Sequence, residues 1–328
     1  MATSGLVSGW DHHVLVATSA LLAAVAATAL TRFAAVRLGL LAEPNRRSSH
    51  ATPTPTAGGL GFIVPVVVFL ILSIDDYPPA LLLATAGVAI ALVGFLDDVK
   101  DLRRDVRLVA HVAIATACVA LLTDEPLLAT AVLILGLAWW INLYNFMDGI
   151  DGIAASQSVI YAAGVLAIGE AAQSAAMAWV LLAASVGFLC FNWAPAKIFM
   201  GDTGSGFLGV VTGSLALWLW QSGELPAVAS LILLVGFWFD ASYTLGVRIV
   251  TGQAFADAHR SHLYQILSRR WGHGRTTALF GAHAVVWLGP LAALSVSFPG
   301  WQAACLIAAC VPAACACIVF RAGAGDAD

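Results

Sequence analysis

The chain has 328 residues, of which 60% are hydrophobic and 10% are charged, and its mean hydropathy is +0.90. A soluble domain is usually about 25% charged, so this composition excludes an ordinary soluble globular protein and indicates a polytopic helical membrane protein. The formal net charge of −4 says little by itself, because the charges are segregated along the chain.

Apolar stretches of spanning length follow one another along the whole chain. About 20 apolar residues cross a hydrocarbon layer of about 30 Å, and helices are expected because backbone groups in lipid must be hydrogen-bonded internally. The sequence predicts eleven spans, at residues 14–36, 58–74, 79–96, 107–123, 127–146, 153–169, 175–193, 206–221, 225–247, 277–297 and 300–320. The second and sixth are short, and we expect neighbouring helices to shield them. The predicted fold is an all-α bundle that forms one integral-membrane domain over residues 1–328.

The loops between the spans divide by charge when they are numbered alternately outside and inside. The inside set holds all fifteen Lys and Arg residues, namely Arg32, Arg37, Arg46, Arg47, Lys100, Arg103, Arg104, Arg107, Lys197, Arg248, Arg260, Arg269, Arg270, Arg275 and Arg321. The outside set holds only acidic charges, namely Asp11, Asp75, Asp76, Asp124, Glu125, Glu170 and Glu224. Cationic loops resist translocation, so this pattern predicts an N-terminus outside, a cytoplasmic C-terminus and eleven crossings.

Every candidate for chemistry lies in the longer, inside loops, at residues 37–57, 97–106, 147–152, 194–205 and 248–276. The first of these loops is basic, rich in hydroxyl groups and ends in two glycines. It offers Arg47, Ser49 and His50 for a phosphate or a lipid head group, although an ordinary positive-inside loop explains it equally well.

Adjacent carboxylates close the third span, in the segment Gly94–Lys100. Asp97 and Asp98 repel each other at a membrane boundary, and a divalent cation would relieve that repulsion. Hard carboxylate oxygens suit Mg²⁺, which usually also takes substrate phosphates as ligands. A solvated helix end is an equally good explanation of this pair alone.

Four polar side chains recur every three residues where the fifth span ends: Asn142, Asn145, Asp148 and Asp151. In a helix they would lie on one drifting face. The glycines that follow the two aspartates allow the backbone to turn and to approach a ligand closely. An ordinary capped turn is the plainer alternative, and two amides and two carboxylates facing the same way disfavour it.

The segment Lys197–Gly206 precedes the eighth span, and the segment His259–Gln265 lies in the last long inside loop. Asp202 lies at a glycine-flanked helix start, where free N–H groups can bind phosphate, or where Asp202 is simply the N-cap. His259, Arg260 and His262 could hold a nucleotide or a diphosphate; a zinc site is weakly supported without a third ligand nearby, and a solvated loop is the alternative.

Ionisable residues also lie deeper in the predicted spans. Asp240 lies in the ninth span, at a cost of about 2.5 to 3.5 kcal/mol, so it should face the bundle and have a partner. Arg248 follows two helical turns further on the same face. His111, in the fourth span, is interpreted as a structural residue. A transporter with a proton path is the second class of function, but its polar groups should lie near the midplane, whereas these cluster at one membrane face.

In motif order and topology, nearly the whole chain resembles the polyprenyl-phosphate N-acetylhexosamine-1-phosphate transferases, which include phospho-MurNAc-pentapeptide translocase. The matching stretches are RSSHATPTPTAGG, GFLDD, NLYNFMDGIDG, FMGDTGSG, DASYTLGVR and HRSHLYQ. The resemblance implies transfer of a sugar-1-phosphate from a UDP-N-acetylhexosamine to undecaprenyl phosphate, with Mg²⁺ or Mn²⁺ and release of UMP. It also implies a bacterial inner (cytoplasmic) membrane protein with a cytoplasmic site, a homodimer, and no nucleic acid partner.

The resemblance assigns roles to residues of these motifs. Asp97 or Asp98 would bind or deprotonate the lipid phosphate, which is already largely ionised at pH 7. The implied catalytic residues are Asp97, Asp98, Asp148 and Asp151, and the implied metal ligands are Asp202 and Asp97. The implied substrate-binding residues are Arg47, Ser49, His50, Lys100, Asn142, Asn145, Lys197, His259, Arg260 and His262.

Two departures separate the chain from the peptidoglycan translocase. That enzyme has three consecutive histidines where this chain has HRSH, and its lysine stands one position later after the aspartate pair than Lys100 does. The HRSH form is more similar to the branch that initiates O-antigen synthesis, so we expect a lipid-linked, O-antigen-like glycan pathway. The translocase reaction itself is the alternative.

Overall fold

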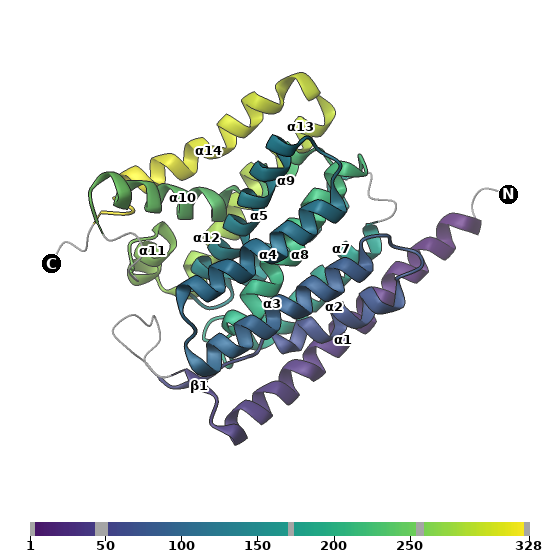
Figure 1. Cartoon of the computed structure of the whole chain (residues 1–328), viewed down its shortest axis with the longest axis horizontal. Helices are drawn as coiled ribbons and strands as arrows, with labels where there is room; N and C mark the ends of the chain where they lie inside the picture. Colours follow the sequence, from purple (N-terminus) through teal and green to yellow (C-terminus); the bar gives the residue numbers. More distant parts are fainter. Residues whose placement is uncertain (1–3, 43–51, 170–173, 254–258, 325–328) are drawn as a thin grey trace.

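The structure is a computed structural model, and it describes residues 4–42, 52–169, 174–253 and 259–324. Almost all of the described chain is helical (Figure 1). The α-helices are α1 (Ser4–Leu38), α2 (Leu60–Leu72), α3 (Ala80–Lys100), α4 (Arg104–Leu122), α5 (Leu127–Met147), α6 (Ile153–Ile168), α7 (Ala175–Asn192), α8 (Gly201–Gln221), α9 (Ala227–Leu233), α10 (Val235–Val250), α11 (Leu263–Trp271), α12 (His273–His283), α13 (Gly289–Ser297) and α14 (Gln302–Val319). Strands β1 (Leu41–Ala42) and β2 (Thr54–Pro55) pair antiparallel.

Eight segments of the described chain are long and apolar enough to cross a membrane, and the bent pair α9–α10 raises that number to nine. The shorter apolar helices α2 and α6 coincide with the two spans that the sequence predicts to be short. Each of the eleven predicted segments is therefore a helix or a run of consecutive helices. The all-α polytopic fold is confirmed, whereas the number of crossings and the sides of the termini stay predictions.

The predicted ninth span, at residues 225–247, is a bent pair of helices in the structure rather than one straight helix. Helices α9 and α10 meet at Leu234 with a bend of 75°. The break frees carbonyl groups at the end of α9, and side chains take them up: Trp238 Nε1 donates to Leu231 O at 2.9 Å, and Gln157 Nε2 donates to Leu233 O at 3.1 Å. Such side-chain partners are what allow a helix to break at membrane depth.

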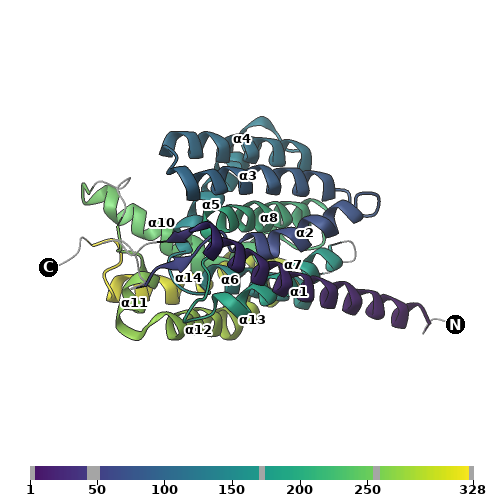
Figure 2. The same cartoon turned by 90° about the horizontal axis from the view of Figure 1, so that it is seen from below.

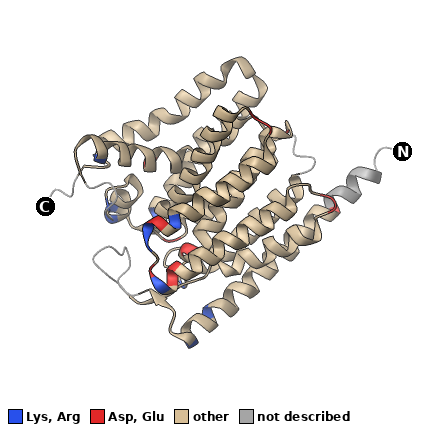
Figure 3. Ribbon diagram, in the orientation of Figure 1, with Lys and Arg blue, Asp and Glu red and all other residues tan. Residues whose placement is uncertain are grey.

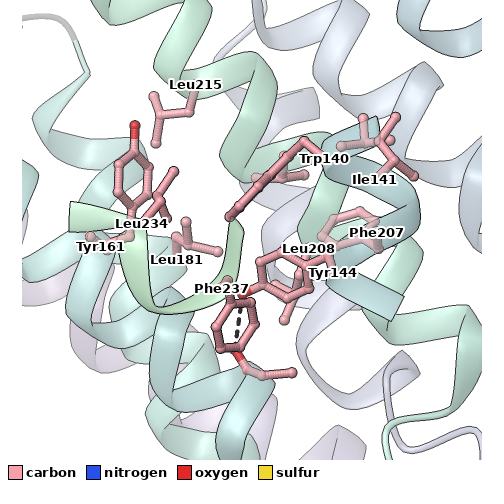
Figure 4. Close-up of a cluster of buried hydrophobic side chains, with 14 of the residues drawn as sticks. Trp140, Ile141, Tyr144, Tyr161, Leu181, Phe207, Leu208, Leu215, Leu234 and Phe237 are labelled. Atoms are coloured by element: carbon pink, nitrogen blue, oxygen red, sulfur yellow. Dashed lines mark hydrogen bonds between the residues drawn. The ribbon is translucent and has the colours of Figure 1, made fainter. Parts of the chain in front are cut away.

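Helix α8 is the centre of the bundle, because 78% of the residues in its most apolar stretch are buried. Figure 2 shows it together with α5 between a layer of α3 and α4 on one side and α12 and α13 on the other. Aromatic side chains fill the core next to it, where Tyr144 packs against Trp140 and Phe237 (Figure 4). Two of these aromatic side chains have paired polar atoms: Trp140 Nε1 donates to Thr212 Oγ1 at 3.0 Å, and the Tyr144 hydroxyl donates to Ala154 O at 2.9 Å.

The surface of the described chain separates into a broad apolar part and one charged end. Large apolar side chains stand exposed along α1, α4 and α5, as Leu30, Leu121 and Leu127 do, which is expected of helices that face lipid. Figure 3 shows the Lys and Arg residues gathered at the lower left, where several acidic residues also lie, while the opposite loops carry acidic residues. The charge segregation expected from the sequence is therefore also a spatial segregation.

Candidate functional site

A cavity of about 310 Å³ opens at the charged end of the bundle, where α3 ends, α8 begins and the turn between α5 and α6 lies. It is lined by Thr56, Asp98, Asn145, Asp148, Gly149, Ile150, Asp151, Asn192, Phe199, Met200, Gly201, Asp202, Gln265 and His273. Five of the residues that the sequence proposes for the site are therefore brought together from three separate motifs. These are Asp98, Asn145, Asp148, Asp151 and Asp202.

Asp98, near the end of α3, accepts hydrogen bonds from the first turn of α8. Its Oδ1 accepts a hydrogen bond from Asp202 N at 2.9 Å, and its Oδ2 accepts from Thr203 N at 3.2 Å and from Thr203 Oγ1 at 2.7 Å. The carboxylate thus supplies acceptors for N–H groups that a helix start leaves unpaired. Gly201 has φ +74°, and a Cβ there would lie 2.6 Å from Asp98 Oδ2, so a glycine is needed for this contact.

Arg107, at the start of α4, lies between two of the carboxylates. Its Nη1 is 2.5 Å from Asp97 Oδ2 and 3.3 Å from Asp202 Oδ2. The other oxygen of Asp97 accepts a hydrogen bond from Leu102 N at 2.7 Å. From the sequence, Arg107 was predicted only to be one of the inside charges. Its position nine residues after the aspartate pair was a signal that could have assigned it to the site. Asp97 itself is buried beside the cavity and does not line it.

The glycines that end the first inside loop dock on the segment before α8. Gly58 N donates to Phe199 O at 2.8 Å, and Gly59 N donates to Met200 O at 2.9 Å. A Cβ on Gly59 would lie 2.4 Å from the Cα of Gly204, so the two backbones touch without room for a side chain. The two glycine-rich motifs therefore form one wall. The proposed residues Arg47, Ser49 and His50 lie outside the described residues.

Asp202 is not the N-cap of α8, because the N-cap position is Met200 and Asp202 lies within the first turn. Its side chain interacts with Asn145. Asp148 follows at the end of α5, and loss of hydration, then repulsion from Asp202, Asp98 and Asp151, raises the pKa of its carboxyl well above the ordinary value. A bound cation would relieve this repulsion.

The donor chemistry of this cluster fits Mg²⁺. Among the described residues, no group of three or more His, Cys, Asp and Glu side chains is arranged to hold a metal ion. Mg²⁺ usually takes only one or two carboxylates from the protein and completes its shell with water and substrate phosphates. Asp148 and Asp202 line the same cavity and meet that requirement.

Asp151 and His273 both line the cavity and lie next to each other, and the sequence did not predict this pair. His273, the first residue of α12, has its Nδ1 3.1 Å from Asp151 Oδ1. The second oxygen of Asp151 accepts a hydrogen bond from Ala196 N at 3.0 Å. Since 122 residues separate Asp151 from His273, no local pattern could predict the pair.

The HRSH segment lies behind the cavity. His262 is buried at the N-cap position of α11, and its Nδ1 is 3.6 Å from Asp240 Oδ1. Asp240 accepts hydrogen bonds from Leu263 N at 2.8 Å and from Tyr264 N at 3.0 Å. The buried partner that the sequence predicts for Asp240 is therefore the N-terminus of α11. Arg248 Nη1 donates to Gln253 Oε1 at 2.9 Å.

Of the segment His259–Gln265, only Gln265 lines the cavity. The remaining proposed substrate-binding residues of the described chain do not line it, namely Lys100, Asn142, Lys197, His259, Arg260 and His262. Lys100 and Lys197 are exposed at the charged end of the bundle, so they are accessible to a substrate that extends beyond the cavity.

The chain is similar to known proteins over most of its length. A family model described as "Glycosyl transferase family 4" matches residues 80–220, which include α3 to α8 and the aspartates of the cavity. The chain is 30% identical over 270 residues, 75% of each chain, to the "Probable undecaprenyl-phosphate N-acetylglucosaminyl 1-phosphate transferase" of Bacillus subtilis. It is also 30% identical to the "Phospho-N-acetylmuramoyl-pentapeptide-transferase" of Staphylococcus saprophyticus over 289 residues, 73% of this chain and 86% of the relative.

Proposed function

Because this chain belongs to glycosyl transferase family 4, we propose that it transfers a sugar-1-phosphate from a UDP-N-acetylhexosamine to undecaprenyl phosphate and releases UMP. The observation that carries the proposal is the convergence of Asp98, Asp148 and Asp202 on one cavity at the charged end of a membrane bundle. A cytosolic, doubly phosphorylated donor and a lipid-held acceptor can meet only at such an end.

Asp148 and Asp202 would hold the Mg²⁺ ion. When bound, that ion neutralises the donor's diphosphate and the charge that develops on the leaving phosphate. Asp98 acts through its hydrogen bonds, since it fixes the turn that presents Asp202. Arg107 compensates the charge of Asp97 and lies within reach of Asp202, so it lowers the electrostatic cost of bringing an anionic acceptor to this cluster.

In the proposed step, an oxygen of the lipid phosphate forms a bond to the sugar-side phosphorus. The bond between that phosphorus and the bridging oxygen breaks, and UMP leaves with the bridging oxygen and the electron pair. The products are UMP and a lipid diphosphate that carries the sugar. Since the lipid phosphate is largely ionised at pH 7, no general base is required, and both Asp97 and Asp98 are already engaged by hydrogen bonds.

The proposed setting is the bacterial cytoplasmic membrane, with the cavity facing the cytoplasm. The concentration of Lys and Arg at the cavity end supports that orientation. We propose an O-antigen-like glycan as the pathway, on the strength of the HRSH form of the last motif. The relatives named phospho-N-acetylmuramoyl-pentapeptide-transferases support the second candidate, transfer of phospho-MurNAc-pentapeptide. A homodimer is part of the same proposal.

The test is release of UMP by purified protein with undecaprenyl phosphate, Mg²⁺ and a panel of UDP-N-acetylhexosamines that includes UDP-MurNAc-pentapeptide. Lipid-dependent release that EDTA abolishes would support the proposal, and the best donor would identify the pathway. Asp202→Asn should reduce turnover at least 100-fold, about 2.7 kcal/mol, as expected for loss of a metal ligand.

Asp105→Asn is the matched control, because Asp105 is an exposed aspartate of the same region that pairs with Arg103. It should leave turnover within about twofold, since exposed ion pairs contribute little. Unchanged turnover in Asp202→Asn would contradict the metal site. No UMP release with any donor, from protein shown to be folded, would contradict the reaction itself.

A further inference from the structure

We propose that Tyr264, on α11, is a positioning residue for the carboxylate of Asp148. Its hydroxyl holds the end of α5 and the turn that follows, so that Asp148 faces the cavity. The proposal rests on the proposed function for the role of Asp148 as a metal ligand. It gives a role to the segment His259–Gln265, which lies mostly behind the cavity.

The Tyr264 hydroxyl lies against the backbone on both sides of Asp148. It donates a hydrogen bond to Phe146 O at 2.7 Å, and a Cβ on Gly149 would collide with its oxygen. The first contact pairs one of the carbonyl groups that the end of a helix leaves free. The second leaves no room for a side chain at Gly149. Tyr264 therefore fixes the chain two residues before Asp148 and one residue after it.

Asp148 needs such a hold because its acidic neighbours repel it. It is the C-cap residue of α5, and repulsion from Asp202, Asp98 and Asp151 acts on its carboxylate. Until a cation is bound, this repulsion favours movements that take the carboxylate out of the cavity. A hydrogen bond to the backbone from behind opposes such movements, so it keeps Asp148 within reach of the ion that Asp202 also binds.

Tyr264 is itself anchored at the start of α11. The residue is fully buried, its N donates to Asp240 Oδ2 at 3.0 Å, and its ring lies 5.8 Å from the ring of His262. Asp240 belongs to α10. A chain of contacts therefore leads from α10 through the first turn of α11 to the end of α5, and no solvent competes for the hydroxyl that completes it.

The test removes the hydroxyl alone with Tyr264→Phe, which keeps the ring and its packing. Tyr161→Phe is the matched control, because Tyr161 is equally buried and its hydroxyl shares a hydrogen bond with Ser230 Oγ at 3.1 Å, away from the cavity lining. We would measure binding of Mn²⁺ alone to the purified full chain by electron paramagnetic resonance. The second readout is the Mg²⁺ dependence of UMP release.

We expect Tyr264→Phe to weaken Mn²⁺ binding about three- to tenfold, as expected for one lost hydrogen bond. The Mg²⁺ concentration for half-maximal turnover should rise by the same factor. Saturating Mg²⁺ should restore kcat to within about twofold of the wild type, because the bound ion selects the arrangement with Asp148 in the cavity. Tyr161→Phe should lower the melting temperature by a similar amount and change neither metal readout.

Gly149→Ala tests the same contact from the other side. The added methyl group meets the Tyr264 oxygen, so this substitution should displace the turn and weaken Mn²⁺ binding. The double variant with Tyr264→Phe should bind Mn²⁺ more tightly than Gly149→Ala alone, because the oxygen that the methyl group meets is gone. Losses that simply add in the double variant would overturn the proposal.

Unchanged Mn²⁺ affinity and Mg²⁺ dependence in Tyr264→Phe would also overturn it, even with a lower melting temperature, since a merely structural hydroxyl would give that result. So would an equal loss of Mn²⁺ affinity in Tyr161→Phe. Mn²⁺ binding requires no turnover, so a protein that binds Mn²⁺ and releases no UMP would refute the proposed reaction and leave this result readable. A wild-type protein that binds no Mn²⁺ would overturn the proposal, because Asp148 would then have no ion to hold.

Discussion

The contact between Asp240 and α11 gives the sharpest prediction for stability. Its two oxygens accept hydrogen bonds from Leu263 N and Tyr264 N at 2.8 and 3.0 Å, and the carboxylate is 2% exposed. A hydrogen bond to a charged group is worth about 1.5–3 kcal/mol, so Asp240→Ala should cost about 3–6 kcal/mol in the docking of α11. Asp240→Asn keeps one oxygen acceptor and should cost about half as much.

The predicted damage is local, because α11 has nine residues and its first two residues donate both of these hydrogen bonds. Tyr264, whose hydroxyl donates to Phe146 O at 2.7 Å, should lose this contact, and Gln265 should leave the cavity wall. Hydrogen exchange followed by mass spectrometry should show faster exchange of α11, by at least about 100-fold for a loss of 3 kcal/mol, with α8 unchanged. Asp240→Ala should increase the exchange rate of α11 more than Asp240→Asn does.

Glu224 provides the matched control at the opposite end of the bundle. It accepts hydrogen bonds from Ser174 N and Ser174 Oγ, each at 3.1 Å, at the start of α7. Glu224→Gln should therefore loosen the start of α7 and leave α11 as it is. If α11 exchanges at the wild-type rate in Asp240→Ala, the hydrogen bonds to Asp240 do not hold the helix, and the reasoning is refuted.

Three further substitutions test the cavity wall. Arg107→Gln leaves Asp97 without its ion partner, so turnover should fall at least about tenfold in the UMP assay while detergent-solubilised protein remains folded by circular dichroism. Gly201→Ala combines a φ of +74° with a Cβ 2.6 Å from Asp98 Oδ2, so it should lower turnover and cost about 1–3 kcal/mol in thermal stability. Gly59→Ala forces a methyl group against the Cα of Gly204 and should lower the melting temperature by several degrees, measured by differential scanning fluorimetry. Wild-type behaviour in any of them would contradict the contact it tests.

The general plan of this fold could be predicted from the sequence, because lipid imposes one strong rule on every span. The segments at 58–74 and 153–169 were predicted to be short, and α2 and α6 are short. The break between α9 and α10 could not be predicted, since it depends on Gln157 from another helix for a freed carbonyl. Local periodicity carries no information about such a partner.

The same limit applies to the site. Asp98, Asp148 and Asp202 were identified because each ends or begins an apolar run on the inside, and alternation of the loops brings such residues to one face. His273 and Gln265 were missed, although both lie in the predicted inside loop 248–276, because their approach to the cavity depends on how α11 and α12 pack. The HRSH residues were expected at the substrate and lie behind the cavity, since the start of α11 is held by Asp240.

Two kinds of carboxylate in the described chain have different physical roles. Asp98 and Asp240 each accept two backbone N–H groups at the start of a helix, α8 in one case and α11 in the other. A helix start carries a partial positive charge, so it stabilises a carboxylate without a metal ion. Asp148 lacks such a partner in the described chain and is repelled by its acidic neighbours. The helix-capping carboxylates therefore fix the geometry of the cavity, and Asp148, which its acidic neighbours repel, is the one that needs a cation.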